Sequence, residues 1–404
     1  MPLRSLSPVG TPLRLRVVLA AIRAASGNGN QQRVFASALA AHLEGATCIP
    51  VSSGRAALAL ILETLREQAD PRRNEVVIPA YTCFSVPSAI VRAGLKVVPC
   101  DMDPQHLDFD QSMLPRLVSS RTLCIVPNHL FGLPARMELT QELASAHGAY
   151  VVEDAAQSLG AHLGGRPVGS LGDVGFLSLG RGKPLTAIDG GVIIVPRGGD
   201  LAAALRERAK RLPRPPRVPW HVVVKAIGHA LFLPPHRFAI AERMPFVKLG
   251  ESKFSPAFDI GGLSAFQSAL AAAALDEQPA VTTKRRANAG VLLEALRDLP
   301  SLEPVQPVKD AEPVYLRLPL RTSRPETREL LYHLLAVRRL GVSRMYPSAI
   351  TTIPELQSHL TASVLACPEA ERVAASLATL PTHPLVGASD LEDIIECLKR
   401  ANLR

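Results

Sequence analysis

Functional side chains are concentrated in one short stretch of the chain, residues 150–191. Each of them stands at the end of an apolar run or in the turn that follows it. Two carboxylates, an amide, a hydroxyl and an amine in such positions are the groups that a site with a nucleophilic amine requires. These groups belong to Glu153, Asp154, Gln157, Ser178 and Lys183.

Lys183 follows a glycine-rich turn and is the candidate nucleophile. A lysine amine forms a Schiff base with a carbonyl when neighbouring positive charge and desolvation lower its pKa, and Arg181 is a nearby source of such charge. A carboxylate such as Asp154 would keep a pyridine nitrogen protonated, so that the ring accepts electrons. The set therefore points to pyridoxal 5'-phosphate (PLP) as cofactor, with Lys183 as its Schiff-base lysine.

A phosphate group requires backbone N–H groups at the start of a helix together with hydroxyl donors. In the segment SSGRAALAL, Ser53 and Gly54 lie where a strand gives way to a helix. Ser178 lies at the end of another strand. We therefore expect Ser53, Gly54 and Ser178 to bind the cofactor phosphate.

The same residues also have structural explanations. Taken alone, Lys183 is a solvated loop lysine and Asp154 is the N-cap of a helix beginning at AAQS. The Ser-Gly pair is equally explained as a cap and a tight turn. The joint occurrence of these groups favours the PLP site.

Seven apolar runs must position these groups. They are rich in β-branched residues, alternate with helix-like stretches and have no polar alternate face. This pattern predicts an α/β fold with a mostly parallel central sheet sandwiched by helices, and with ligands at the strand ends. The runs are residues 48–52, 75–79, 96–100, 123–127, 150–154, 174–179 and 191–196.

The length of 404 residues indicates more than one domain. We expect an N-terminal arm over residues 1–30, a large PLP-binding domain over 31–250 and a smaller α+β C-terminal domain over 251–404. A basic, proline-rich insertion interrupts the large domain at about 205–250. An alanine-rich helix over about 263–299 is expected to connect the domains.

The net charge of +9 does not indicate a nucleic-acid-binding protein. Residues 201–250 contain ten cations and two acids, so this segment alone carries a charge of +8. The six cysteines form no CxxC pair and have no histidine partner at metal spacing, so we expect no disulfide framework, no metal site and a cytoplasmic location. His129 and His383 are expected to be structural histidines held by hydrogen bonds.

Two segments have patterns that also occur at membranes. Residues 13–27 place cations before an apolar stretch, but Arg23 interrupts it, and we expect an amphipathic helix rather than a signal peptide. Residues 212–240 contain an apolar stretch that Lys225 and His229 interrupt and that is too short to span a bilayer. This stretch would either pack on a partner subunit or contact the inner face of the membrane peripherally.

The chain resembles the DegT/StrS-type sugar aminotransferases, which are PLP-dependent enzymes of fold type I. The resemblance covers most of the chain and rests on the segments SSGRAAL, VVIPAYTC, VPNHLFGLPA, VVEDAAQSLGA, VGSLGDVGFLSL, GRGKPLT, YPSAI and LPTHPL. It implies the fold of that family, PLP as cofactor, and a homodimer with active sites at the subunit boundary.

The resemblance also implies roles for individual residues. Asp154 would pair with the pyridine nitrogen, and Gln157 would lie near the phenolic oxygen. Ser178 would bind phosphate, and Lys183 would be both Schiff base and proton shuttle.

The chain departs from the family pattern in several places. Cys83 occupies the position of the aromatic residue that stacks on the cofactor ring, with Tyr81 and Phe84 as alternatives. The acidic turn GEGG is replaced by IDGG around Asp189, and FDIGGLSAFQSAL lacks the asparagine and arginine that contact the partner's phosphate. Arg55 stands where threonine is commoner and would take over part of the phosphate binding.

The resemblance implies a transaminase that moves an amino group, from a donor such as glutamate, to a nucleotide-linked keto sugar. The product would enter cell-surface polysaccharide or secondary-metabolite biosynthesis. One alternative is a PLP enzyme that acts on a non-sugar ketone or as a dehydratase, although dehydrating members tend to carry histidine at the position of Lys183. Another is a non-catalytic homologue that serves as a binding or regulatory subunit.

Overall fold

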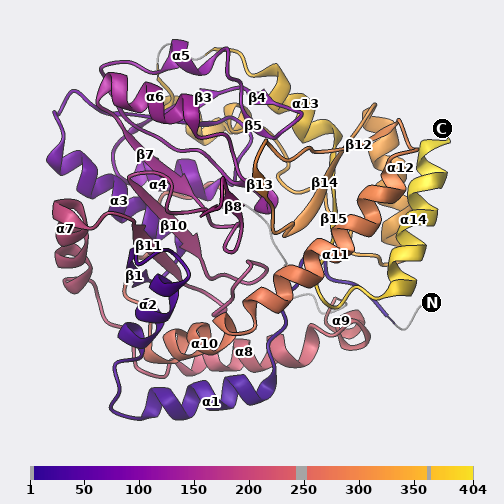
Figure 1. The fold of residues 1–404 in the computed structure, drawn as a ribbon, viewed down its shortest axis with the longest axis horizontal. Coiled ribbons are helices and arrows are strands. Elements are labelled where there is room, and N and C mark those ends of the chain that lie inside the picture. The colour runs from indigo at the N-terminus through magenta and orange to yellow at the C-terminus, as the bar shows by residue number, and fades with distance from the viewer. Residues whose placement is uncertain (1–3, 243–252, 362–364, 404) are drawn as a thin grey trace.

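A seven-stranded sheet forms the centre of the computed structural model, which describes residues 4–242, 253–361 and 365–403 (Figure 1). The strand order is β1-β11-β10-β7-β6-β2-β3. Strands β10, β7, β6, β2 and β3 are parallel, whereas β11 is antiparallel to both β10 and β1. The predicted α/β fold with a mostly parallel sheet is confirmed. The strands are β1 (Thr47–Val51), β2 (Glu75–Pro79), β3 (Lys96–Cys100), β6 (Thr122–Ile125), β7 (Tyr150–Asp154), β10 (Val174–Ser178) and β11 (Gly191–Val195).

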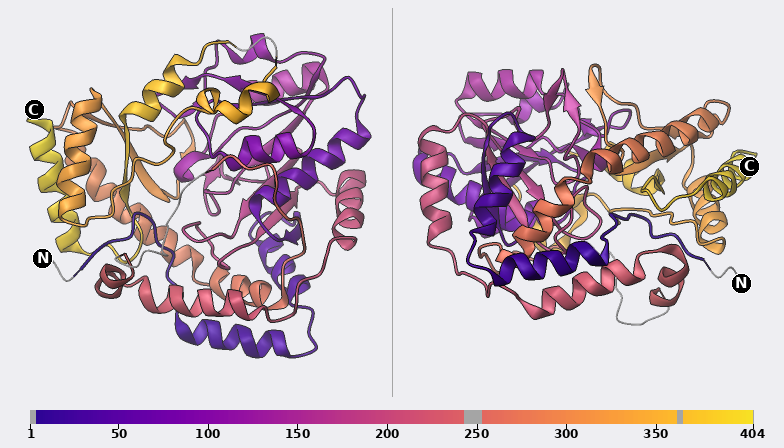
Figure 2. Two further views of the ribbon diagram at one scale, coloured as in Figure 1. Left: turned by 180° about the vertical axis from the view of Figure 1, so that it is seen from behind. Right: turned by 60° about the horizontal axis from the view of Figure 1, so that its bottom comes forward.

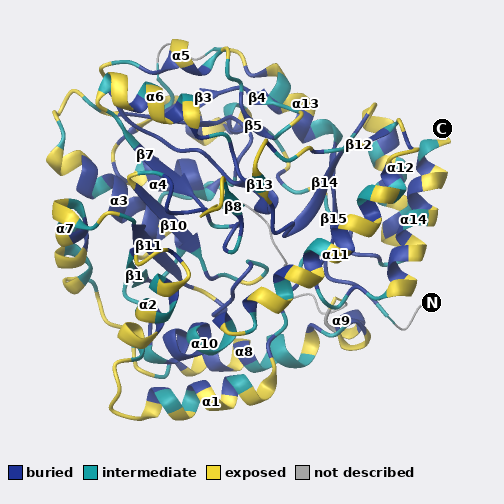
Figure 3. Cartoon of the chain, in the orientation of Figure 1, coloured by how far each residue is buried: buried dark blue, intermediate teal, exposed yellow. Residues whose placement is uncertain are grey.

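Both faces of this sheet are buried, which explains why its strands are apolar throughout. Alternate residues enter two different cores: Val76 and Ile78 lie in one core, and Val77 between them lies in the other. Figure 3 shows the buried strands between helices whose outer faces are exposed. The first core is closed by α3 (Gly54–Gln68), α4 (Ser85–Arg92) and α7 (Gly199–Lys210), and the second by α2 (Gln31–Ala41), α5 (Leu114–Leu117), α6 (Glu138–His147) and α10 (Ala265–Leu275).

The sheet brings two predicted site residues to one edge. Strands β7 and β10 are parallel neighbours, and Phe176 pairs with Asp154 in their register. Asp154 and Ser178 are the last residues of these two strands. Because the carboxyl ends of parallel strands meet at the same edge, the turns after β7 and β10 lie next to each other.

A smaller antiparallel sheet in the order β12-β14-β15 forms the second layered unit. Leu292, Leu331 and Ile394 belong to the core beneath it. The elements of this unit are β12 (Leu302–Pro304), β14 (Arg317–Thr322), β15 (Leu377–Pro381), α11 (Gln278–Leu296), α12 (Pro325–Val337), α13 (Pro368–Ser376) and α14 (Ala388–Asn402). Short elements complete the fold: β4 (Met102–Asp103), β5 (Asp108–Phe109), β8 (His162–Leu163), β9 (Arg166–Pro167), β13 (Ala311–Glu312), η1 (Leu130–Gly132), η2 (Ile350–Thr352) and η3 (Pro354–His359).

The segment expected to form one connecting helix forms two helices, α10 and α11. The break precedes Pro279, which lacks a backbone N–H and stands in the first turn of α11. Ser264 caps α10 in a capping box with Gln267. Helix α10 packs against the helices before the first strand, while α11 runs diagonally to the smaller sheet (Figure 1). The predicted domain boundary at 250/251 stays a prediction, and α10 lies beyond it on the large sheet.

Helices α1 (Leu15–Ser26) and α8 (Trp220–Phe232) lie along the bottom of Figure 1, and α9 (Pro235–Ala241) follows α8 on the side of the smaller unit. Helices α1 and α8 are side by side in both views of Figure 2 and share a core that includes Val18 and Val222. Residues 243–250 of the predicted insertion lie outside the described residues. Among the helices that are described, none has the length and apolar character needed to cross a membrane.

Candidate active site

Asp154 presents a buried carboxylate at the end of β7, with only 4% of the residue exposed. Its Oδ1 accepts a hydrogen bond from the backbone N–H of Ala156 at 3.1 Å, as expected for a residue that caps the following turn. Burial raises the pKa of the Asp154 carboxyl, while the positive charge of Lys183 acts in the opposite direction. The carboxylate is therefore placed to hold a positive group in a low-dielectric environment.

The neighbouring Glu153 and His129 form a fully buried pair that supports this strand end. Three backbone N–H groups in the 169–172 turn donate to the Glu153 carboxylate at 2.5–2.8 Å. His129 Nδ1 accepts from the backbone N–H of Ala135 at 2.9 Å, so the ring proton lies on Nε2, which donates to Glu153 at 3.0 Å. His129 also donates its backbone N–H to the Asp154 carbonyl at 3.1 Å. The structure thus gives His129 the hydrogen-bonded structural position that we expected.

Lys183 lies in the loop that connects β10 and β11. Backbone hydrogen bonds from Leu179 to Gly190 and from Arg181 to Ile188 close this loop as an extension of the antiparallel pair. Lys183 donates its backbone N–H to Gly180 at 3.2 Å, and its carbonyl accepts from the Thr11 hydroxyl. The loop is therefore fixed both by the sheet and by the N-terminal segment.

The electrostatics of the Lys183 amine match those of a reactive lysine. The residue keeps part of its surface exposed, but burial of the amine lowers its pKa, and the charge of Arg317 lowers it further. The Asp154 carboxylate acts in the opposite direction. Lys183 and Asp154 thus stabilise each other's charged forms at the edge of the sheet.

The start of α3 closes on Ser178. Ser53 caps this helix: its hydroxyl accepts from the Ala56 N–H at 3.1 Å and its carbonyl accepts from the Ala57 N–H at 2.9 Å. The two preceding N–H groups of the first turn, those of Gly54 and Arg55, have no partner within the helix. A Cβ atom on Gly54 would lie 2.9 Å from Ser178 Cβ, and one on Gly191 would lie 2.4 Å from the Ser53 carbonyl carbon. Glycine at these positions lets β10, β11 and the start of α3 approach closely. Ser53, Gly54 and Ser178 are thereby brought together.

Gln157 connects the sheet edge to the smaller unit. Its Oε1 accepts from the backbone N–H of Phe131 at 3.2 Å, and its Nε2 donates to the Tyr346 hydroxyl at 2.9 Å. Phe131 adopts a left-handed backbone with φ of 57°, which aims its N–H at this amide. The sequence identifies YPSAI only as a family segment, and nothing local to its tyrosine, Tyr346, signals a position beside Gln157, far away in the sequence.

Aromatic rings surround the Cys83 position. Tyr346 lies edge-on to Tyr81 with ring centroids 5.5 Å apart, and it stacks on Phe84 at 6.5 Å. Cys83 is half-buried, and its Sγ lies 2.9 Å from the Ser85 hydroxyl. Tyr81 is fully buried. Which residue stacks on a cofactor ring stays a prediction.

Two predicted residues lie apart from this cluster. The exposed Arg55 places its guanidinium 4.8 Å from the centre of the Phe258 ring, so the structure does not bring that group to Ser178. His383 lies within the smaller unit, where its Nε2 donates to the Ser7 carbonyl at 2.9 Å.

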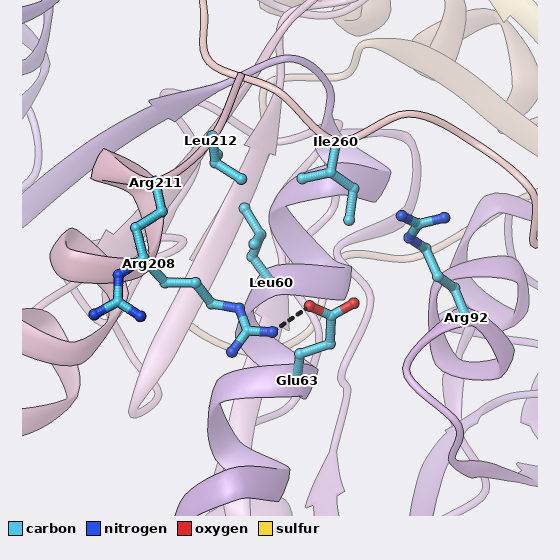
Figure 4. A pocket seen from close by; sticks show the side chains of 7 residues that line it. All are labelled: Leu60, Glu63, Arg92, Arg208, Arg211, Leu212 and Ile260. Atoms are coloured by element: carbon cyan, nitrogen blue, oxygen red, sulfur yellow. Dashed lines mark hydrogen bonds and ion pairs between the residues drawn. The ribbon is translucent and has the colours of Figure 1, made fainter. Parts of the chain in front are cut away.

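A surface cavity of about 400 Å³ also lies away from the cluster, beside α3, α4 and α7 (Figure 4). Its acid, Glu63, is already paired with Arg208 at 2.7 Å. It contains none of the residues singled out for chemistry and offers no free acid or nucleophile, so we place the candidate site at the sheet edge. The cavity is lined by Leu60, Glu63, Arg92, Arg208, Arg211, Leu212 and Ile260.

The sequence model of the DegT/DnrJ/EryC1/StrS aminotransferase family matches residues 14–213 and 256–399. The chain belongs to this family. The match includes Lys183, the strand end with Asp154, and most of the smaller unit. The resemblance drawn from the short segments is therefore confirmed. The family assignment makes the chain an aminotransferase by descent.

Curated relatives and solved structures agree with this assignment. The chain is 31% identical, over 80% of its length and 68% of the relative's, to an L-glutamine:2-deoxy-scyllo-inosose aminotransferase of Micromonospora echinospora. It is 34% identical, over 44% of its length and 47% of the relative's, to a UDP-N-acetyl-3-dehydro-alpha-D-glucosamine 3-aminotransferase of Acidithiobacillus ferrooxidans. The crystal structure of S. venezuelae DesV in complex with a ketimine intermediate is 25% identical, has a TM-score of 0.78 and covers 96% of this chain and 95% of that one.

Proposed function

We propose that the chain is a PLP-dependent transaminase that moves an amino group from an amino acid such as glutamate to a keto sugar linked to a nucleotide. The observation that carries the proposal is that the sheet edge buries two groups of opposite charge, the Lys183 amine and the Asp154 carboxylate, each of which acts on the pKa of the other. Perturbed ionisable groups of opposite sign next to a helix start are typical of a site that binds and activates a charged cofactor.

The residues present fit PLP. Asp154 is buried, and no ion pair with a cationic side chain is found for it among the described residues, so its carboxylate is available to a protonated ring nitrogen. Ser53, Gly54 and Ser178 surround the start of α3, where backbone N–H groups favour a phosphate. Lys183 supplies the amine. When bound, PLP would supply an electron-accepting ring.

The chain's own groups would then divide the work. The Lys183 amine would take a proton from the donor carbon and return it to the neighbouring reacting carbon, because its lowered pKa leaves more of it neutral and able to accept. Asp154 would hold a proton on the ring nitrogen. Gln157, fixed from both sides by Phe131 and Tyr346, would orient the ring oxygen.

The names of two relatives bear on the class of acceptor. One relative is named for a UDP-linked keto sugar, which supports a nucleotide-linked acceptor and a role in polysaccharide or secondary-metabolite biosynthesis. Another is named for a carbocyclic ketone without a nucleotide, with glutamine as donor. We therefore keep a free cyclic ketone as a second candidate acceptor. Steady-state assays with both classes, each with glutamate and with glutamine, would distinguish them.

The cofactor and the donor step can be tested directly. Purified protein with added PLP should show a visible absorbance band that glutamate or glutamine shifts and that borohydride fixes covalently. The Lys183→Ala variant should lose the covalent fixation, and an exposed control such as Lys210→Ala should retain it. Absence of any band in the wild-type protein would overturn the proposal and favour a non-catalytic homologue.

We also propose a cytoplasmic homodimer. Trp220 and Val224 on α8 are each 66% exposed, and Leu19 on α1 is 45% exposed, so the face formed by these two helices is partly apolar. A partner subunit would cover such a face. Peripheral contact of residues 212–240 with anionic lipid is the alternative. Light scattering and sedimentation with anionic vesicles would separate the two.

A further inference from the structure

The loop between β10 and β11, residues 179–190, carries Lys183 and is supported by helix α8 as well as by the sheet. We call it the lysine loop. Its Ile188 is fully buried in a core that also contains Val222 and Val223 of α8. Ile188 has a φ of 74°, a left-handed conformation that is costly for a β-branched residue. Packing against the helices therefore holds the loop in a shape that its own backbone disfavours.

The N-terminal segment contacts the lysine loop directly. A Cβ atom on Gly182 would lie 2.6 Å from Val9 Cγ1, so Val9 packs against the bare backbone of the loop. Two residues further along, the Thr11 hydroxyl donates to the carbonyl of Lys183. The backbone of the candidate Schiff-base lysine is thus held by a side chain from outside the loop.

A buried arginine fixes the direction of the Thr11 hydroxyl. Nη2 of Arg285 donates to Thr11 Oγ1 at 3.3 Å, and a hydroxyl oxygen that accepts a hydrogen bond still has its one proton to donate. Arg285 is 1% exposed, and its Nη1 donates to the Leu316 carbonyl at 2.8 Å. The group that orients the Thr11 hydroxyl is therefore itself fixed in the smaller unit.

His229 of α8 holds the backbone of the same threonine. Its Nε2 donates to the Thr11 carbonyl at 3.0 Å, and because a carbonyl can only accept, the ring proton lies on Nε2. Burial lowers the pKa of His229, the hydrogen bond to Thr11 opposes this, and the charge of Arg181 in the lysine loop lowers the pKa further. A neutral ring is sufficient for this hydrogen bond, so the contact persists at neutral pH.

We propose that Thr11 is a positioning residue for Lys183 and that α8 acts through it, by the hydrogen bond from His229; the inference rests on the proposed transaminase function. The Lys183 amine would have to reach two neighbouring carbons in one turnover, so its backbone must stay in place while the side chain moves. Helix α8 would then contribute to the reaction without supplying a reacting group.

The first test compares Thr11→Val, which removes the hydroxyl, with Thr11→Ser, which keeps it. We expect Thr11→Val to lower kcat about 10- to 50-fold while both KM values stay within about threefold, because a displaced amine reacts slowly although the substrates still bind. Thr11→Ser should restore kcat to within about threefold of wild type. Thr322→Val is the control, since the buried Thr322 hydroxyl also donates to a backbone carbonyl, that of Arg324, and its loss should leave kcat unchanged.

A double variant tests the path from α8 to the lysine. His229→Leu removes the donor to the Thr11 carbonyl and should lower kcat about 5- to 10-fold, and His229→Gln, which keeps a side-chain N–H donor, should recover part of this. The variant with both Thr11→Val and His229→Leu should lose no more than about twice what Thr11→Val loses alone, because residues that act through one group are not additive. Losses that multiply would show independent effects and overturn the proposed path.

Hydrogen exchange tests the inference without turnover. In the full-length protein without added PLP, the amides of residues 179–190 should exchange at least about tenfold faster in Thr11→Val than in wild type, and somewhat faster in His229→Leu. Exchange in this loop should be unchanged in Thr11→Ser and in Thr322→Val, and exchange in β2 and β3 should be unchanged in all variants. Mass spectrometry of peptides would measure both regions.

Equal exchange of the lysine loop in wild type and Thr11→Val, or an equal rise throughout the large sheet, would overturn the positioning role of Thr11. The same holds for a fall in kcat of similar size in Thr322→Val. If no amino donor reacts with the wild type, the proposed function fails, and the exchange measurement still decides whether Thr11 holds the lysine loop.

Discussion

The two sides of the candidate site balance their charges differently. On the side of the large sheet, the Asp154 carboxylate and the Lys183 amine each favour the charged form of the other, and the Glu153 carboxylate is satisfied by backbone N–H groups and His129. On the side of the smaller sheet, Arg285 and Arg317 lie buried without acids among the described residues. The difference is that the sheet edge satisfies its carboxylates with groups of its own, whereas on the other side the Arg317 guanidinium has one long hydrogen bond among the described residues.

Removing the Lys183 amine, on the side of the large sheet, should have the largest effect on turnover. We expect Lys183→Ala to lower kcat by about 10⁴-fold or more, because both the covalent attachment point and the proton carrier are lost. Single-turnover kinetics would measure this. A smaller loss of kcat in Lys183→Ala than in Tyr346→Phe would remove the contrast between the two sides.

Removing the negative charge of Asp154, on the same side, should have the second largest effect on turnover. Asp154→Asn keeps the shape of the side chain but should lower kcat by about 10²- to 10³-fold, because the ring nitrogen would no longer be held protonated. The Asp154 charge raises the pKa of Lys183, so its loss should move the acid limb of the pH–rate profile to lower pH. A profile that moves to higher pH would contradict the electrostatic coupling.

The hydrogen bond between Gln157 and Tyr346, which connects the two sides, should contribute less to turnover than Lys183 or Asp154 does. Tyr346→Phe removes the acceptor of the hydrogen bond from Gln157 Nε2 and leaves that buried amide unpaired. The expected cost is about 1–3 kcal/mol in stability or transition-state binding, seen as a loss of kcat/KM of about 5- to 100-fold. Tyr332→Phe provides the control, because Tyr332 is a half-buried tyrosine of α12 whose ring lies against Arg344, away from Gln157. A similar loss there would show a general effect of tyrosine removal.

His383, which lies near Arg285 in the smaller unit, should make the stability of the protein depend on pH. Burial and the neighbouring Arg285 lower the pKa of His383 to about 3, well below its unfolded value of 6.5. Between these values the unfolded chain binds the proton and the folded chain does not, so the free energy of unfolding falls as the pH is lowered from about 6.5. This group should contribute a loss of about 2 kcal/mol between pH 7 and pH 5, measured by urea unfolding. His383→Gln should flatten that dependence, and an identical slope in both proteins would refute it.

The smallest effect is expected far from either side. Trp220→Gln on the exposed face of α8 should change the free energy of unfolding by no more than about 0.5 kcal/mol. It should instead weaken self-association, detected by light scattering over a dilution series. If self-association were unchanged and vesicle binding were lost, this face of α8 would be a lipid contact and not a subunit contact.

Much of the candidate site at the sheet edge could be predicted because the residues that form it lie close together in the sequence. Asp154, Gln157, Ser178 and Lys183 fall within a stretch that contains two adjacent strands and their turns, so periodicity alone places them at one edge. The seven apolar runs became the seven strands of the large sheet for the same reason.

The opposite side could not be predicted because its contacts are distant in sequence. Gln157 and Tyr346 are 189 residues apart, and no spacing rule connects them. Arg317 lies in a strand pattern that indicates packing rather than charge, and the left-handed backbone at Phe131 has no signal in its own residue type. The break before Pro279 has a local signal, the proline itself, which the alanine-rich pattern around it obscured.

The segment before α1 has a consequence for how the chain folds during synthesis. Ser7 is bonded to His383, 376 residues later, and Arg4 to Asp390, 386 residues later. These residues leave the ribosome long before their partners exist, so their docking must be among the last events of folding. Since Thr11 in the same segment holds the carbonyl of Lys183, the nascent chain can complete its sheet while its reactive loop is still loose. Maturation of the active site would then be a separate, late kinetic phase, set by the arrival of the C-terminal helix.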